Sequence, residues 1–144
     1  MQPIYGIRST AAYYRLWVLD MASIREAKLY RYMEPPTNPS DLAWLAGILE
    51  GEGCFGHWPD NKGVRYPTIS LLMTDRDIVE RTAEYLGSRF YSAKPRHPST
   101  KTLYRLVVNG AKAAKFMLAL LPYVGERRSA KINGILRCWI GQQL

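Results

Sequence analysis

Two glutamates separated by a single glycine end an apolar segment in the first half of this 144-residue chain. The segment reads DLAWLAGILEGEG, Asp41 to Gly53, and its final carboxylates belong to Glu50 and Glu52. Carboxylate oxygens are ligands for hard cations such as Mg²⁺. A carboxylate at a helix C-terminus also opposes the helix macrodipole, so a purely structural sequence would gain from lysine there. The two carboxylates could bind a cation, and the simpler alternative is a solvent-exposed helix end.

Positive charge gathers at the other end of the chain. Residues 91–144 hold ten Lys or Arg against one acidic residue, Glu126, a net charge of +9. Residues 1–40 carry +2 and residues 41–90 carry −3. The strong excess of positive charge in residues 91–144 predicts a polyanionic partner, and nucleic acid is the commonest partner of this kind. The alternative is a charge surplus that only favours solubility.

Composition indicates an ordinary globular protein, with 47% hydrophobic and 22% charged residues. Cys54 and Cys138 lack metal-ligand spacing and are expected to be reduced thiols. The sequence shows neither an apolar run long enough for a membrane span nor the pattern of a signal peptide. These features predict a cytoplasmic location, in a bacterium, a phage-infected cell or an organellar matrix, and not a secreted protein.

Hydrophobic periodicity and turn residues predict the elements that position these groups. After a Pro-rich linker the expected order is α-β-β-α-β-β-α-α. Residues 1–40 are expected to form a helical N-terminal extension with this linker, and residues 41–144 the main α+β domain. The expected elements are a helix over 42–51 capped by Ser40 or Asp41, strands over 54–58 and 65–73, a helix capped by Thr74 or Asp75 and ended by Gly87, strands over 89–94 and 102–110, a helix over 111–121 stopped by Pro122, and a helix over 129–144.

The motif LAGILEGEG, Leu45 to Gly53, resembles the signature of the LAGLIDADG homing endonucleases. Four positions match outright, and Glu50 and Glu52 replace two aspartates. The element order follows at the family's spacing over residues 41–144, and MTDRD and LPYVGERR look like further landmarks. The resemblance implies the α-β-β-α-β-β-α fold with an antiparallel DNA-binding sheet. It also implies a site-specific double-stranded DNA endonuclease of a mobile intron, intein or free-standing element.

The resemblance implies an active site shared between two copies of the chain. One chain carries one motif, so a homodimer acting on a roughly palindromic target is expected. Pairing would bring like-charged carboxylates together, and Mg²⁺, or Mn²⁺ in its place, would neutralise them. Small residues would let the two helices approach closely. The implied interface residues are Trp44, Ala46, Gly47, Ile48 and Gly51.

Roles at this site also follow from the resemblance. Glu52 is the implied principal metal ligand, with the carbonyl of Gly51 beside it. Glu50 is as compatible with a direct catalytic role as with a capping role. Met73 departs from the family, because many members carry a polar, water-positioning residue near this position.

A basic residue would stabilise the charge of the transition state. Arg127 matches the family's basic residue, and arginine acts there electrostatically because it does not act as a base. Arg128 and Lys131 are neighbours that could substitute, and phosphate anchoring is the alternative role for both arginines.

The resemblance implies that two-stranded ribbons lie in consecutive major grooves of DNA. Counting every second residue from Glu52 places Cys54, Gly56 and Trp58, and then Tyr66, Thr68 and Ser70 of the next strand, on the DNA-facing side, with Arg65 at its edge. Lys94, Arg96, Lys101 and Arg105 are candidates from the second hairpin, and Arg128 and Lys131 from the segment that enters the last helix. Leu103, Val107 and their neighbours make the fourth strand apolar on both faces, so its register stays open. The residues expected to contact DNA are Trp58, Arg65, Tyr66, Thr68, Ser70, Lys94, Arg96, Lys101, Arg105, Arg128 and Lys131.

Two other functions remain open at this point. One is a DNA-binding protein or intron-splicing maturase that no longer cleaves, with RNA as a partner in the maturase case. Met73 and the two Glu-for-Asp replacements favour it. The other is a structural dimer whose basic tail is incidental.

Overall fold

The predicted order of elements is confirmed in the computed structural model, which describes residues 38–93, 97–98 and 100–143. The helical extension predicted before residue 38 lies outside the described residues. No described helix has the length and hydropathy of a membrane span. The elements are α3 (Pro39–Gly51), β1 (Gly53–Pro59), β2 (Arg65–Met73), α4 (Arg76–Leu86), β3 (Tyr91–Ala93), β4 (Leu103–Asn109), α5 (Gly110–Leu120), the 3-10 turn η1 (Leu121–Tyr123) and α6 (Glu126–Gln143).

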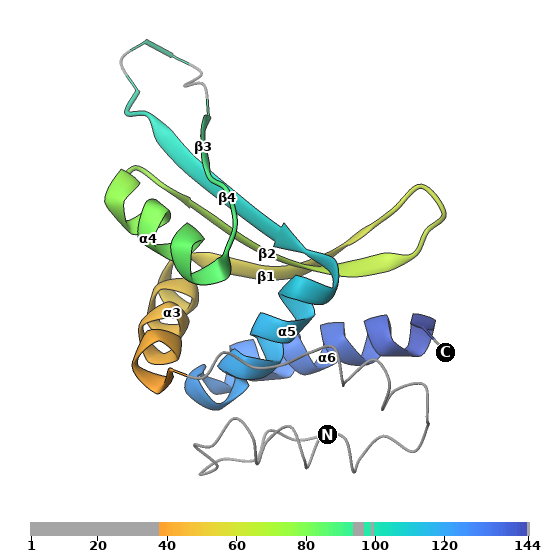
Figure 1. Ribbon diagram of the computed structural model, residues 1–144. Helices are drawn as coiled ribbons and strands as arrows, with labels where there is room; N and C mark the ends of the chain where they lie inside the picture. The colour runs from red at the N-terminus through yellow and green to blue at the C-terminus, as the bar shows by residue number, and fades with distance from the viewer. Residues whose placement is uncertain (1–37, 94–96, 99, 144) are drawn as a thin grey trace.

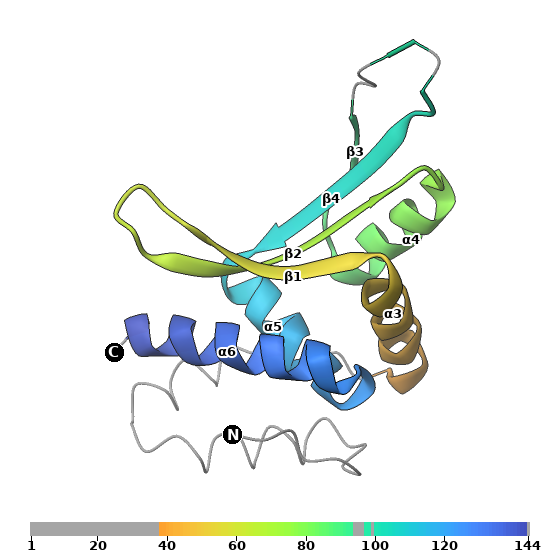
Figure 2. The same cartoon turned by 180° about the vertical axis from the view of Figure 1, so that it is seen from behind.

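The four strands form one antiparallel sheet in the order β1-β2-β4-β3. The four helices of the described residues all pack on the same face of this sheet, as the two opposite views show (Figures 1 and 2). None of these described helices lies on the other face. The β1–β2 and β3–β4 hairpins reach out in different directions from the helical layer, which gives the sheet a curved outer surface.

Side chains alternate between the two faces along each strand, which explains why the helices cover only one face of the sheet. Phe55, Ile69 and Leu106 come from three different strands, and all three are fully buried beneath the helices. Leu49 of α3 and Met117 of α5 join the same core. The apolar interior therefore lies between the sheet and the helices, and fixes which face of every strand remains outside.

Both outer helices begin three residues earlier than the sequence predicted. Helix α3 starts at Pro39, and Asn38 is its N-cap in place of Ser40 or Asp41. The Asn38 side-chain oxygen accepts from the backbone N–H of Ser40 at 3.0 Å. Proline suits the first helical turn because the N–H that it lacks would have no intrahelical acceptor at this position. Helix α6 starts at Glu126, so Arg127 and Arg128 lie in its first turn.

The predicted ends of α4 are confirmed. Asp75 is its N-cap, and Gly87 follows its last turn in the left-handed conformation, with φ +59°. The second hairpin is less regular than expected, because β3 has only three residues, Tyr91–Ala93.

Candidate functional site

Helix α3 ends at the carboxylates of Glu50 and Glu52. Gly51 is the last helical residue and Glu52 is the C-cap, its N–H bonded to the carbonyl of Ile48 at 2.9 Å. The Glu52 side chain is exposed, and its carboxylate makes no hydrogen bond or ion pair with the described residues. As a terminal helical residue, Gly51 has a carbonyl without an intrahelical donor. The Glu52 carboxylate and the Gly51 carbonyl are therefore two neighbouring oxygen groups at this helix end that could bind a metal ion.

Glu50 points elsewhere, to the start of α6. Its carboxylate accepts a hydrogen bond from the backbone N–H of Gly125 at 3.2 Å. A carboxylate at a helix N-terminus satisfies an unpaired N–H and interacts favourably with the macrodipole. Gly125 leaves room for it, because a Cβ at that position would lie 3.3 Å from Glu50 Oε1. Of the two roles open for Glu50, the capping role is the one with a contact.

Arg128 completes a reciprocal arrangement between the two helices. Its Nη2 donates to the backbone carbonyl of Glu50 at 3.1 Å. A cation thus stands at the C-terminus of α3 while an anion stands at the N-terminus of α6. Arg128, expected as a substitute cation or a phosphate anchor, is therefore already hydrogen-bonded at the helix junction. Arg127 and Lys131, one turn apart on α6, are both exposed.

One face of α3 is exposed and lined by small residues. Ala43, Gly47 and Gly51 are exposed at successive i, i+4 positions, and added Cβ atoms at both glycines would meet nothing within 4 Å. The prediction was wrong for Ala46, which is 2% exposed and packs into the chain's own core. Ile48 is half-buried beside that core.

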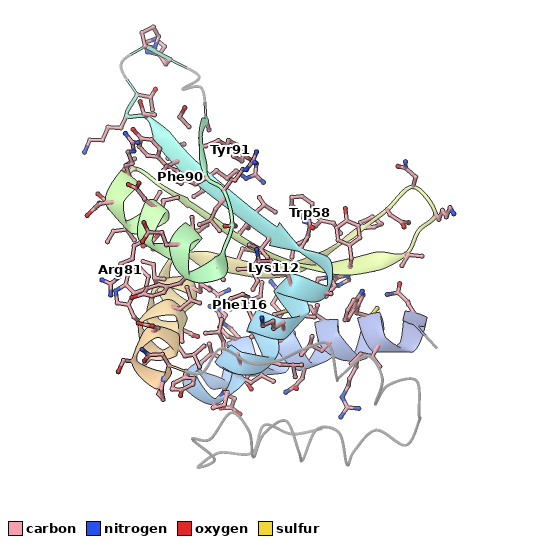
Figure 3. All side chains as sticks on the ribbon, viewed as in Figure 1. Trp58, Arg81, Phe90, Tyr91, Lys112 and Phe116 are labelled. Carbon is pink, nitrogen blue, oxygen red and sulfur yellow. The ribbon has the colours of Figure 1, made fainter. Side chains whose placement is uncertain are left out.

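Trp44 is half-buried because its ring packs against α4, so only part of its side chain could contact a partner. Its ring lies 5.4 Å from that of Tyr85. The guanidinium of Arg81 sits 4.0 Å above the Trp44 ring centroid and donates to the Tyr85 hydroxyl at 3.2 Å. Arg81 lies where α4 faces α3 (Figure 3). The interaction fixes the Trp44 side chain at the border of the small-residue face.

Gly53 sets how closely β1 follows α3, a role that was not predicted from the sequence. A Cβ there would lie 2.6 Å from Leu49 Cδ2 and 2.8 Å from Leu49 Cα. Only glycine fits this approach, which holds Glu52 at the edge of the sheet. A glycine directly between a helical pattern and a strand pattern is the signal that indicates such a contact.

The strand register defines an uncovered surface, called the open face from here on. It consists of Cys54, Gly56 and Trp58 of β1, Tyr66, Thr68, Ser70 and Leu72 of β2, Tyr91 and Ala93 of β3, and Leu103, Arg105, Val107 and Asn109 of β4. Trp58 stands on the side of the sheet away from the helices (Figure 3). The surface begins two residues after Glu52, so the acidic helix end and the open face are contiguous in the chain.

Several residues expected to contact DNA share this face, and some do not. Trp58, Tyr66, Ser70 and Arg105 lie on it, whereas Thr68 is on it but only 3% exposed. Arg65 lies on the opposite side of β2. Its Nη1 is 3.3 Å from His57 Nδ1, and the Gln142 side chain bonds its backbone N–H and carbonyl. Lys101 is exposed next to β4, and Lys94 and Arg96 lie outside the described residues.

The donors at the end of α3 fit a hard divalent cation by chemistry. A carboxylate and a backbone carbonyl are the oxygen ligands that Mg²⁺ takes. Within the described part of the chain, no three His, Cys, Asp or Glu side chains gather to hold a metal ion. One chain therefore offers part of a ligand set, and a complete one requires donors from elsewhere.

Comparison with solved structures identifies the architecture. The homing endonuclease I-CvuI, in complex with its target, superposes with a TM-score of 0.55 at 20% identity over 69% of this chain and 68% of its own. The LAGLIDADG meganuclease I-AabMI, bound to uncleaved DNA, gives 0.52 at 19% identity over 71% of this chain and 38% of its own. The group I intron-encoded homing endonuclease I-CeuI, complexed with DNA, superposes with a TM-score of 0.50 at 14% identity. The match covers 99% of this chain and 80% of that of I-CeuI.

No family model and no curated protein matches the sequence. The agreement is one of structure, and it coincides with the signature-like motif on α3. The chain adopts the fold of the LAGLIDADG homing endonucleases.

Proposed function

We propose that the chain is one half of a homodimeric, Mg²⁺-dependent DNA endonuclease that makes a staggered double-strand break in a roughly palindromic site. The observation that carries the proposal is the position of Glu52. Its free carboxylate stands where an exposed face of small residues on α3 meets the open face of the sheet. The structures with the same fold were determined with DNA bound.

Each part of the reaction has a candidate residue in this arrangement. Glu52 and the Gly51 carbonyl of each subunit would hold the metal, which supplies charge neutralisation and an activated water when bound. Arg127, exposed in the first turn of α6, would face the phosphate whose negative charge grows in the transition state. Glu50 and Arg128 hold α3 against α6, so they position the reacting groups without touching substrate.

Pairing through α3 accounts for the exposed small-residue face of this helix. Ala43, Gly47 and Gly51 allow two helices to approach closely, and the approach brings both Glu52 carboxylates near the two-fold axis. A symmetric pair also places two open faces side by side, which matches a target with two similar half-sites.

Plasmid cleavage tests the proposal directly. A supercoiled plasmid would carry the DNA that flanks this reading frame, joined at the presumed insertion boundary. We expect linear product with Mg²⁺ and none with EDTA. Glu52→Gln should abolish cleavage and leave binding measurable, whereas Glu80→Gln, an exposed carboxylate on α4, should cleave like the wild type.

A second candidate is the DNA-binding protein or maturase without cleavage. Met73 favours it, because this side chain lies on the helix-covered side of β2 and packs against the core. Tight binding of the plasmid fragment without cutting, in Mg²⁺ or Mn²⁺, would select this function and overturn the first.

A further inference from the structure

The open face carries unusually large apolar side chains for a sheet surface in contact with water. Trp58, Leu72 and Tyr91 are 45%, 47% and 52% exposed. They account for three of the four large hydrophobic side chains exposed in the described residues, and all three lie on this one face. A solvated face of an antiparallel sheet normally alternates to polar residues. Such a patch marks an interaction surface.

The register groups these side chains in two places. Leu72 of β2 and Tyr91 of β3 both pair with Arg105 of β4, so one guanidinium is flanked on each side by an apolar side chain. Trp58 pairs with Tyr66 at the other end of the sheet. Arg105 is the charged member among the open-face residues defined above, and none of them is acidic.

Basic residues stand at the margins of this apolar centre. Lys62 is exposed in the turn of the β1–β2 hairpin, and Lys101 is exposed beside β4 in the other hairpin. The two hairpins project at separate ends of the sheet (Figures 1 and 2). Cations at the margins suit the phosphates that border a groove, and the centre then faces the edges of the bases. Asp60 shares the turn with Lys62, so charge is one part of the argument, and the other is that structures with the same fold have DNA bound. Together these observations favour duplex DNA as the occupant over an apolar protein partner.

The major groove has one strongly apolar feature, the 5-methyl group of thymine. Resting on the proposed function, we propose that Trp58, Leu72 and Tyr91 determine specificity by packing against thymine methyl groups of the target. The target half-sites would then be rich in thymine opposite these side chains. Each methyl removed from water by such a contact strengthens binding about fourfold.

Uracil substitution isolates the methyl group, because deoxyuridine keeps every hydrogen-bonding edge of thymidine. The full chain would first select duplexes from a pool with a random central segment. The enriched duplex would then be synthesised with thymine or with uracil at each position in turn. We expect uracil to weaken binding about fourfold at the contacted positions and to have no effect elsewhere.

A double-mutant cycle assigns the contact to a side chain. Leu72→Ala should weaken binding of the thymine duplex, and uracil at its contacted position should then cause no further loss. Leu72→Met, which keeps an apolar side chain, should keep the uracil effect. Leu72 is exposed and outside the core, so both variants should unfold at the wild-type temperature.

The outcomes separate the two proposals. Equal affinity for thymine and uracil duplexes, or a uracil effect unchanged by Leu72→Ala and by alanine at Trp58 and Tyr91, would overturn the inference and leave the endonuclease proposal standing. If no duplex is enriched at all, the proposed function itself fails and the inference fails with it.

Discussion

At the scale of single residues, two glutamates of the same motif have different surroundings. Glu50 caps the N-terminus of α6 through Gly125, whereas Glu52 is exposed and makes no polar contact with the described residues. Their spacing of two along a turning chain sends the two side chains in different directions. One carboxylate therefore has a partner within the fold, and the other is exposed and available to a ligand.

This difference predicts opposite effects on stability and activity. Glu50→Ala should lower the free energy of unfolding by about 1 kcal/mol, because a helix N-terminus loses its anionic partner. Glu52→Ala should leave it unchanged and abolish cleavage. Urea unfolding followed by circular dichroism measures the first, and the plasmid assay the second. Equal stability of the two variants would contradict the capping role.

At the scale of elements, the close approach of β1 to the end of α3 fixes where Glu52 stands. Gly53 has no room for a side chain, because Leu49 occupies the space that a Cβ would need. The helix end and the sheet edge are thus held close together, with Glu52 at their junction.

Gly53→Ala should cost about 1–3 kcal/mol, since Leu49 and the strand must both shift. Gly134→Ala is the matched control, because this exposed glycine of α6 has nothing within 4 Å of an added Cβ. Alanine there should be neutral or stabilise the helix. Thermal unfolding of both variants measures the difference, and a Gly53→Ala protein as stable as the wild type would contradict the steric argument.

At the scale of the whole molecule, one chain exposes two surfaces that could bind a partner, the small-residue face of α3 and the open face. Under the proposed function, a two-fold assembly through α3 would complete the proposed metal site and extend the proposed DNA-binding surface together. Each chain has a mass of 16.5 kDa, so a dimer is easily distinguished from a monomer.

Gly47→Leu tests the pairing at its centre. The side chain would project from a face where nothing lies within 4 Å, so the single chain should still fold. Two helices could no longer approach closely, and we expect monomers in sedimentation velocity where the wild type gives dimers. Gly134→Leu, on an exposed position of α6, should remain dimeric. A wild-type protein that sediments as a monomer would contradict the assembly.

Much of the fold was predictable because local patterns and core burial agree. The periodicity of α4, with Val79 and Leu86 buried and Gly87 at its end, predicts that helix and its stop. The starts of α3 and α6 were placed too late, since Asn38 and Glu126 carry no hydrophobic signal. Ala46 was assigned to the wrong face, because a short stripe of small residues does not show which of its members the core takes.

The sequence by itself determined the α+β order, the acidic end of α3 and the basic C-terminal third, because composition and periodicity are local properties of the chain. Only the tertiary structure decided the register of β4. Leu106 and Val108 pair with the buried side of β2, and this leaves Arg105 and Val107 on the open face. The tertiary structure also separated the roles of Glu50 and Glu52. The helix that Glu50 caps begins 76 residues further along the chain, and only folding brings the two together.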